Sequence, residues 1–312
     1  TQWLYRHGNL GVDIFFAISG LLICSRLLDE ERIAGSISIR DFYIRRAFRI
    51  LPPAIAFLAT LVILSALVHL PVGIPEVLAS LFFVRNYTFF FQHLQSMAPF
   101  YTSHFWSLAV EEHFYLLLPA LLVFAPKRWR VPSLLVLAAT VGIHRFVLGA
   151  SASSMHTDTR LDALVVPAAL AILLRSEEFR RRLTPLLRLW PALAFGLAAL
   201  VIGEWAPRLQ ALALAWLCPI LILGTMLRPS SLFSRFLELP AMRYLGRLSY
   251  SIYLWQQVFF VAHFGRPLPG WGVPQQWPLA PVMTLACAML SFYFIERPAI
   301  RAGHRLVETL TA

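Results

Sequence analysis

The stretch HFWSLAVEEHFYLLLP, residues 104–119, places two adjacent carboxylates, Glu111 and Glu112, inside a segment that otherwise has the composition of a membrane helix. A charged side chain at the centre of a bilayer helix costs roughly 2.5–3.5 kcal/mol on insertion scales, so acids there are expected to be paired, protonated or facing a polar cavity. This stretch therefore indicates a membrane fold and is the first place to look for chemistry.

The composition of the whole chain indicates an integral membrane protein. Hydrophobic residues make up 58% of the 312 residues and charged residues 14%, whereas about one-quarter of the residues of soluble domains are charged. A helix needs about 20 apolar residues to cross a hydrocarbon core roughly 30 Å thick. We predict an all-α, polytopic helix bundle in one domain over residues 1–312. Nine windows qualify as spans: 10–28, 50–70, 105–125, 132–148, 161–175, 189–205, 209–227, 245–264 and 279–296.

The distribution of arginines predicts how the bundle is oriented. A tenth apolar segment, 76–92, is short and contains Arg85 and Asn86. If it does not cross, 21 of the 27 basic residues lie in loops on one side, which the positive-inside rule makes the cytoplasmic side. We therefore predict a re-entrant or interfacial helix at 76–92. We attribute the net charge of +11 to topology and expect no nucleic-acid partner.

Helical spacing sorts the polar residues of the 104–119 segment into faces. His104, Ser107, Glu111 and Tyr115 are expected to share one face, while Glu112 points about 100° away. A carboxylate on that face is suited to orient a histidine base and to stabilise its cationic form, which makes Glu111 and His104 candidate catalytic residues. The alternative is a hydrogen bond or ion pair that only fixes helix packing.

A second polar cluster lies at the predicted outer end of the span that starts at 161. Asp158 is suited to cap that helix. Capping does not explain Arg160 together with Asp162 in the next turn, which indicates a polar vestibule. Asp13 enters the membrane from the same side, so Arg160 and Asp13 are further candidate catalytic residues.

Three arginines precede the span that starts near residue 50, on the predicted cytoplasmic side. Arg46 and Arg49 lie one helical turn apart, as do Arg45 and Arg49, a spacing that suits a bidentate grip on phosphate. The same arginines suit positive-inside signalling or binding of anionic lipids. The sequence leaves both readings open.

Several other features have structural explanations. Ser19 and Gly20 are expected to allow close helix packing in preference to supplying a serine nucleophile. Cys24, Cys218 and Cys287 all fall in apolar spans, which favours buried thiols over disulfides or metal ligands. The sequence contains no phosphate-binding loop, dinucleotide glycine motif, HExxH or CxxC, so we predict no metal site and no nucleotide-driven chemistry.

Six motifs occur in an order that resembles the membrane-bound acyltransferase family 3, whose members include O-antigen and other polysaccharide O-acetylases. They are GVDIFFAISGLLI (11–23), FYIRRAFRILPP (42–53), HFWSLAVEEHFYLLLP (104–119), TRLDAL (159–164), LGRLSYSIYLWQ (245–256) and ERP (296–298). The resemblance spans nearly the whole chain, and six motifs in the family's order are highly specific.

The resemblance implies ten membrane helices with both ends in the cytoplasm, and transfer of an acyl group from cytoplasmic acyl-CoA to a hydroxyl of a glycan outside. It implies that Arg46 and Arg49 bind the phosphates of CoA. It also matches Glu111 to the acid of the motif that contains WSL, and Arg160 to the arginine of the outer-cluster motif. Family members carry an Arg and a His ten residues apart in their first helix, and the His is thought to be the catalytic base.

Only ten residues precede GVDIFF, so we expect that first helix upstream of Thr1 and regard the domain as incomplete at its N-terminus. The chain also departs from the family in two places. Gln256 stands where a histidine is common after YLW, and His113 stands where a glutamine is common after the paired acids. Neither departure touches the core of the resemblance.

The sequence thus predicts a multi-pass O-acyltransferase of the inner membrane that uses acyl-CoA, with acetyl-CoA as the expected donor. The expected partners are membrane lipids and a glycan or lipid-linked saccharide, such as lipopolysaccharide. One alternative is a proton- or ion-coupled transporter, in which Asp13, Glu111, Glu112 and Asp162 form a relay. The other is a catalytically inactive acyltransferase-like fragment.

Overall fold

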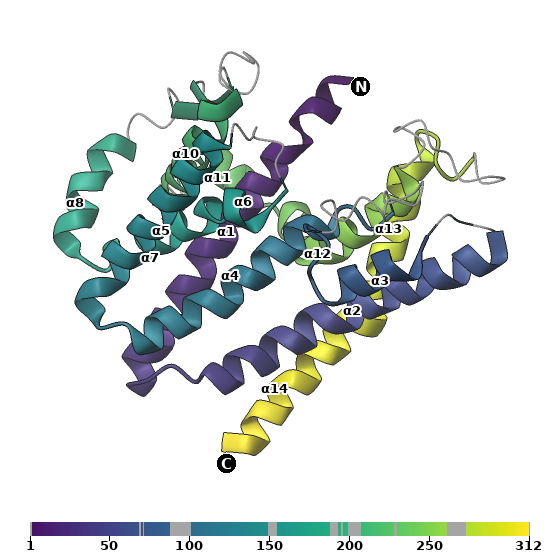
Figure 1. Cartoon of the computed structure of the whole chain (residues 1–312), viewed down its shortest axis with the longest axis horizontal. Coiled ribbons are helices and arrows are strands. Elements are labelled where there is room, and N and C mark those ends of the chain that lie inside the picture. The colour runs from purple at the N-terminus through teal and green to yellow at the C-terminus, as the bar shows by residue number, and fades with distance from the viewer. Residues whose placement is uncertain are drawn as a thin grey trace. The chain divides into compact units, whose positions relative to one another are not determined.

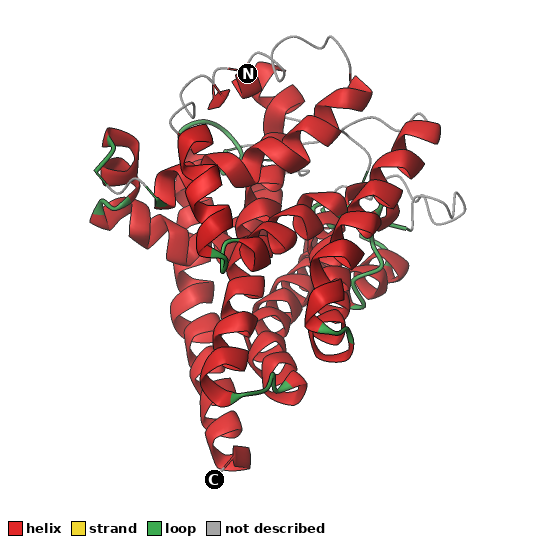
Figure 2. Cartoon of the chain, turned by 90° about the vertical axis from the view of Figure 1, so that its left-hand side faces the viewer, coloured by secondary structure: helices red, strands yellow, loops and turns green. Residues whose placement is uncertain are grey.

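The computed structural model describes residues 2–311 except for 69, 71, 88–100, 149–154, 188–192, 195, 199–206, 228–229 and 261–272. Every regular element of the described residues is a helix (Figure 2), which confirms the predicted all-α class. The chain divides into two compact units: unit 1 comprises Thr1–Ile37 and Val110–Phe236, and unit 2 comprises Ser38–Ala109 and Leu237–Ala312. The assignment of residues 1–312 to a single domain stays a prediction.

The helices are labelled in Figure 1. Unit 1 holds α1 (Gln2–Ala34), most of α4 (Phe105–Phe124), α5 (Lys127–Val147), α6 (Thr157–Arg160), α7 (Asp162–Leu173), α8 (Glu177–Leu186), α10 (Pro207–Met226) and α11 (Leu232–Leu237). Unit 2 holds α2 (Ile39–Val68), α3 (Ile74–Leu81), the first turn of α4, α12 (Pro240–Phe259), α13 (Leu279–Ser291), the π-helical turn η5 (Phe292–Glu296) and α14 (Arg297–Thr311).

Unit 1 is built around α7, which packs against α1, α5 and α10. Nine of its 12 residues are buried, as expected for a helix that is apolar on all sides. Gly20 of α1 makes a close approach to α7, since a Cβ at this position would lie 2.3 Å from the carbonyl oxygen of Leu164. The close packing predicted for Gly20 is therefore confirmed.

Unit 2 is organised along α2, on which α14 and α12 pack. Gly303 of α14 permits the first contact, because a Cβ there would lie 2.7 Å from Cβ of Phe48. Tyr250 of α12 donates a hydrogen bond from its hydroxyl to the carbonyl oxygen of Ile50 at 2.8 Å. These contacts fix α12 beside the part of α2 that follows the three arginines.

Five helical segments of the described residues are long and apolar enough to cross a membrane. They are Leu10–Ala34, Ile39–Leu67, Phe105–Phe124, Lys127–Val147 and Leu279–Thr311, and two shorter apolar helices cover Asp162–Leu173 and Leu212–Met226. These segments agree with a helical membrane protein. The predicted span 189–205 lies largely outside the described residues, and the count of nine spans stays a prediction.

The segment 76–92 begins with the short helix α3, which has only eight residues. At 1.5 Å per residue this helix is about 12 Å long, far less than the hydrocarbon core requires. Turns follow it, and the side chains of Arg85 and Asn86 are buried in them. The described part of this segment thus contains only a short helix, and its re-entrant or interfacial placement stays a prediction, while residues 88–92 lie outside the described residues.

Candidate active site

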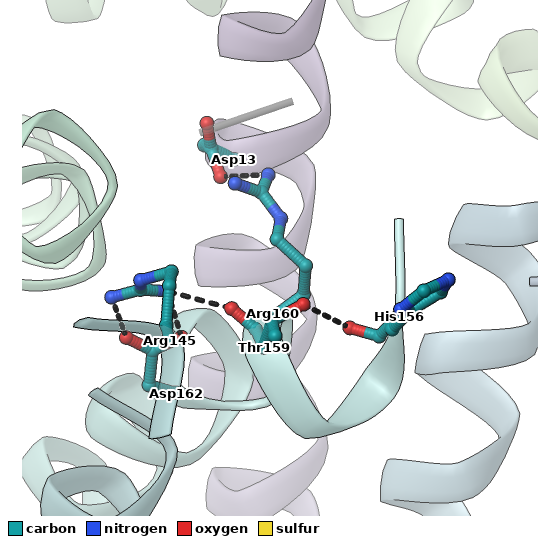
Figure 3. Close-up of polar contacts among 6 residues, drawn as sticks. All are labelled: Asp13, Arg145, His156, Thr159, Arg160 and Asp162. Atoms are coloured by element: carbon teal, nitrogen blue, oxygen red, sulfur yellow. Dashed lines mark hydrogen bonds and ion pairs between the residues drawn. The ribbon is translucent and has the colours of Figure 1, made fainter. Parts of the chain in front are cut away.

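The outer cluster predicted from the sequence brings together residues of α1, α5, α6 and α7 (Figure 3). Arg160 of α6 donates to Asp13 of α1, with 2.5 Å between Nη2 and Oδ1. Arg145 of α5 binds both carboxylate oxygens of Asp162, the first residue of α7, at 3.0 and 2.7 Å. Arg145 Nη1 also donates to the carbonyl oxygen of Thr159 at 2.7 Å.

These two ion pairs are almost completely buried, because the exposed fractions of the four charged side chains are only 1–3%. Removal of one partner from a buried pair costs about 3–5 kcal/mol, since it strands the other charge in a medium of low polarity. Each aspartate thus stabilises an arginine that would otherwise be stranded. This pairing makes the cluster an anchor between α1, α5, α6 and α7.

Two histidines tie α6 to neighbouring helices. His144 of α5 lies with its Nε2 2.9 Å from Oδ2 of Asp158, and both side chains are nearly half exposed. His113 of α4 lies with its Nδ1 2.7 Å from Oγ1 of Thr157. The prediction that Asp158 caps a helix was wrong: the helical turn already begins at Thr157 with His156 as its N-cap, so Asp158 lies inside it and bonds His144 instead.

Glu111 lies in a second buried cluster of unit 1. Ser19 of α1 and Tyr115 both donate hydrogen bonds from their hydroxyl groups to Oε1 of Glu111, and the two hydroxyl oxygens are 2.5 Å apart. All three side chains are buried, whereas Glu112 is partly exposed. The bond between positions 111 and 115 confirms that these residues share a face of α4, as the helical period predicts.

His104 and Ser107, the other two residues of the predicted stripe, belong to unit 2 and contact Tyr253 of α12. The Tyr253 hydroxyl donates to the carbonyl oxygen of His104 at 2.8 Å and lies 2.5 Å from Oγ of Ser107. Neither ring nitrogen of His104 has a hydrogen-bond partner among the described residues. The catalytic roles of His104 and Glu111 stay predictions.

The three arginines predicted to bind phosphate lie near the start of α2. Arg49 is exposed, and Arg45 and Arg46 are partly buried. Arg49 interacts electrostatically with Glu296 of η5, whose Oε2 accepts a hydrogen bond from Ser251 of α12 at 2.8 Å. The guanidinium of Arg49 makes no hydrogen bond to another described residue, so it is available to an anion from outside the protein.

Sequence reasoning missed two residues of these clusters. Ser19 was interpreted as a packing residue, although it bonds Glu111 from 92 positions away. Arg145 was not singled out among the basic residues, although it binds Asp162. A buried acid needs a partner, so the sequence signal for both was the presence of unpaired acids within apolar segments. Nothing in the sequence says which residue supplies that partner.

Comparison with known proteins decides the family. A family model described as an acyltransferase domain matches residues 1–296. The chain belongs to this acyltransferase family. All the motifs from GVDIFF through the first residue of ERP lie within the match. No solved structure matches the chain.

The chain is similar to several bacterial O-acetyltransferases, some of which have peptidoglycan in their names. The O-acetyltransferase OatA of Staphylococcus aureus is 28% identical over 331 residues, which cover 98% of this chain. The putative peptidoglycan O-acetyltransferase YrhL of Bacillus subtilis is 32% identical over 96% of the chain, and the peptidoglycan O-acetyltransferase OatA of Listeria monocytogenes is 30% identical over 96%. The chain spans about half the length of these relatives, 54%, 51% and 52% respectively.

The pairing of Asp13 with Arg160 can be tested by a double-mutant cycle. We expect Asp13→Leu and Arg160→Met each to lower the free energy of unfolding by about 3–5 kcal/mol, because each strands a buried charge. The double variant removes both charges and should lose far less than the sum. Denaturant titration in detergent micelles measures these values. Arg180→Gln, which breaks an exposed pair with Glu177, is the control and should change little. Additive losses in the double variant would contradict the pairing.

Proposed function

We propose that the protein is a membrane O-acyltransferase that moves an acetyl group from cytoplasmic acetyl-CoA to a hydroxyl of a cell-envelope glycan on the outer side of the cytoplasmic membrane. Membership of the acyltransferase family over residues 1–296 carries this proposal. The names of the relatives support acetyl as the acyl group. Two of these names favour peptidoglycan as the acceptor over the lipopolysaccharide expected from the O-antigen resemblance.

The arginines at the start of α2 are the residues that we assign to the acyl-CoA donor. A guanidinium binds phosphate through two parallel N–H groups, and Arg46 and Arg49 are separated by one turn of the same helix. The exposure of Arg49 supports the assignment, because a ligand that arrives from the cytoplasm has to reach it. Anionic lipid headgroups have the same chemistry and are the competing ligand.

Glu111 is the acid that we assign to the reaction. Its Oε1 accepts hydrogen bonds from Ser19 and Tyr115, which fixes its orientation within unit 1. A carboxylate held in this way is suited to orient a histidine base and to stabilise the cation formed when that base takes the proton of the attacking hydroxyl.

The alternative of an ion-coupled transporter finds less support in these contacts. A relay requires acids that are free to exchange a proton or cation with one another. Asp13 and Asp162 instead bond arginines, and Glu111 bonds two hydroxyl groups. The buried acids of unit 1 are thus bound to other groups of the protein and do not form a chain of acids.

The donor assignment predicts the effect of removing one arginine. Arg46→Ala should weaken the binding of acetyl-CoA by about 1.5–3 kcal/mol, the range for a charge-assisted hydrogen bond. Calorimetric titration of the full-length protein in lipid nanodiscs measures this loss. Arg182→Ala removes an equal charge from the exposed face of α8 and should leave the affinity unchanged. If folded Arg46→Ala bound acetyl-CoA as tightly as the wild type does, the arginines would have a role only in membrane topology.

The assignment of Glu111 predicts a difference between the adjacent acids. Glu111→Gln keeps the shape of the side chain but removes its charge, so acyl transfer from labelled acetyl-CoA should slow by about 10²–10⁴-fold. Glu112→Gln is the control and should keep most of its turnover at matched yield. The reverse order would mean that the helical-face argument chose the wrong acid. If neither change mattered, the paired acids would be structural and the site would have to be sought around Asp158, Arg160 and Asp162.

A further inference from the structure

Unit 2 contains an aromatic cluster around His104 to which the proposed function gives no role. Its centre is Phe57 of α2, whose side chain is fully buried. The ring of His104 lies edge-on to it at a centroid distance of 5.3 Å, and the ring of Trp255 of α12 does so at 5.5 Å. Phe105 contacts both Phe57 and His104, and Tyr253 lies 5.4 Å from His104. We call these five residues the Phe57 cluster.

Two polar groups of the Phe57 cluster are buried without a hydrogen-bond partner among the described residues. They are the imidazole of His104, at both ring nitrogens, and the indole Nε1 of Trp255. A buried polar group left unpaired costs about 1–3 kcal/mol, so folded proteins rarely retain one without a use for it. The backbone of His104 is nevertheless firmly held, since Tyr253 donates to its carbonyl oxygen. Within the part of the chain that the structure describes, the cluster therefore holds two unpaired polar side chains among aromatic rings.

The imidazole of His104 is suited to donate a hydrogen bond and poorly suited to act as a base. Burial, and to a smaller extent the charge of Arg85, lower the pKa of His104 to about 3. The ring is therefore neutral at physiological pH and carries one N–H donor. A general base works best when its pKa lies near the working pH, which this histidine does not satisfy. The indole of Trp255 is also a donor only.

The Phe57 cluster lies within reach of the arginines that we assign to CoA. Phe57 follows Arg49 by eight residues of α2, a rise of about 12 Å along the helix axis. α12 follows the same course, because Tyr250 contacts Ile50 while Trp255 contacts Phe57. The arm of CoA between its phosphates and its sulfur has about as many chain atoms as four peptide residues, so it spans up to ~14 Å when extended. A donor held by its phosphates at Arg49 can therefore bring its thioester to the cluster.

We propose that the N–H groups of His104 and Trp255 bind the carbonyl oxygen of the acyl thioester and stabilise the negative charge that develops on it during transfer. This inference rests on the proposed acyltransferase function and adds to it the residues that recognise the reacting carbonyl. Donors placed where charge develops, in a site that excludes water, are worth far more than they are in water. The apolar rings of Phe57 and Phe105 supply that exclusion.

In the step that these donors assist, every bond that forms or breaks belongs to the acyl-CoA or to the acceptor. The hydroxyl oxygen of the acceptor forms a bond to the carbonyl carbon, and the electron pair of the carbonyl moves onto its oxygen, where His104 and Trp255 hold it. The carbonyl then reforms and the carbon–sulfur bond breaks. The sulfur keeps that electron pair and takes up the proton that the hydroxyl loses, so the products are the O-acyl ester and free CoA.

The test uses an unreactive ketone analogue of acetyl-CoA, in which a methylene group separates the sulfur from a ¹³C-labelled carbonyl. Titrated into the full-length protein in nanodiscs, the analogue should bind more tightly than free CoA. Its carbonyl stretch should move to lower frequency than in water, as expected for an oxygen that accepts strong hydrogen bonds. Trp255→Phe keeps an aromatic ring in the cluster and removes one donor, so it should reduce the affinity for the analogue relative to CoA about three- to tenfold. It should also reverse part of the frequency shift.

Trp255→Phe and His104→Phe should each lower kcat by about 10²–10³-fold, as the loss of one oxyanion donor does. His104→Phe should match Trp255→Phe in the frequency shift, and His104→Gln, which restores an N–H donor, should recover part of it. Trp129→Phe is the matched control, because Trp129 is exposed on α5 and outside the cluster; it should leave every readout unchanged.

Two results would overturn the proposal in distinguishable ways. The carbonyl stretch of the analogue bound to the wild type could have the same frequency as in water, or the wild type and Trp255→Phe could give equal frequencies and affinity ratios. Either result would mean that these N–H groups do not bind the carbonyl. The binding of CoA itself would then still support the acyltransferase. Failure of the wild-type protein to bind either CoA or the analogue would remove the donor on which both proposals depend.

Discussion

Arg145 and Arg160 each bind an aspartate in the interior of unit 1, and the arrangement of that unit depends on these two pairs. A charge buried among apolar helices is tolerated only when it is paired and hydrogen-bonded. The segment from Thr157 to Asp162 meets this requirement within six residues and links α5 to α7 and α6 to α1. A helix of four residues thus acts as a fixed point for helices far longer than itself.

The same pairs position the acid that we assign to chemistry. Asp13 and Ser19 are both carried by α1, so the bond from Arg160 to Asp13 and the contact of Gly20 with Leu164 together fix where Ser19 lies. Ser19 in turn donates to Glu111 of α4. We therefore expect a change in the ion pair to affect the orientation of Glu111 through Ser19, which makes Asp13 and Arg160 positioning residues in this account.

The sequence predicted those features that depend on residues close together in the chain. The helical period placed Glu111 and Tyr115 on one face, and the tolerance of Gly20 for close packing followed from its size. Contacts between distant segments were not predictable, because a buried acid shows only that it needs a partner. The contact of Ser19 with Glu111 and that of Tyr253 with His104 depend on how helices distant in sequence pack together.

The most direct test of the anchoring role is the hydrogen exchange of the backbone amides in α6. Short helices normally open easily, and exchange reports that opening. If the buried pairs hold α6, the amides of Thr159 and Leu161, bonded to His156 and Thr157, should exchange orders of magnitude more slowly than those of the longer, exposed helix α8. Exchange in α6 as fast as in α8, measured on the folded protein in nanodiscs, would contradict the account.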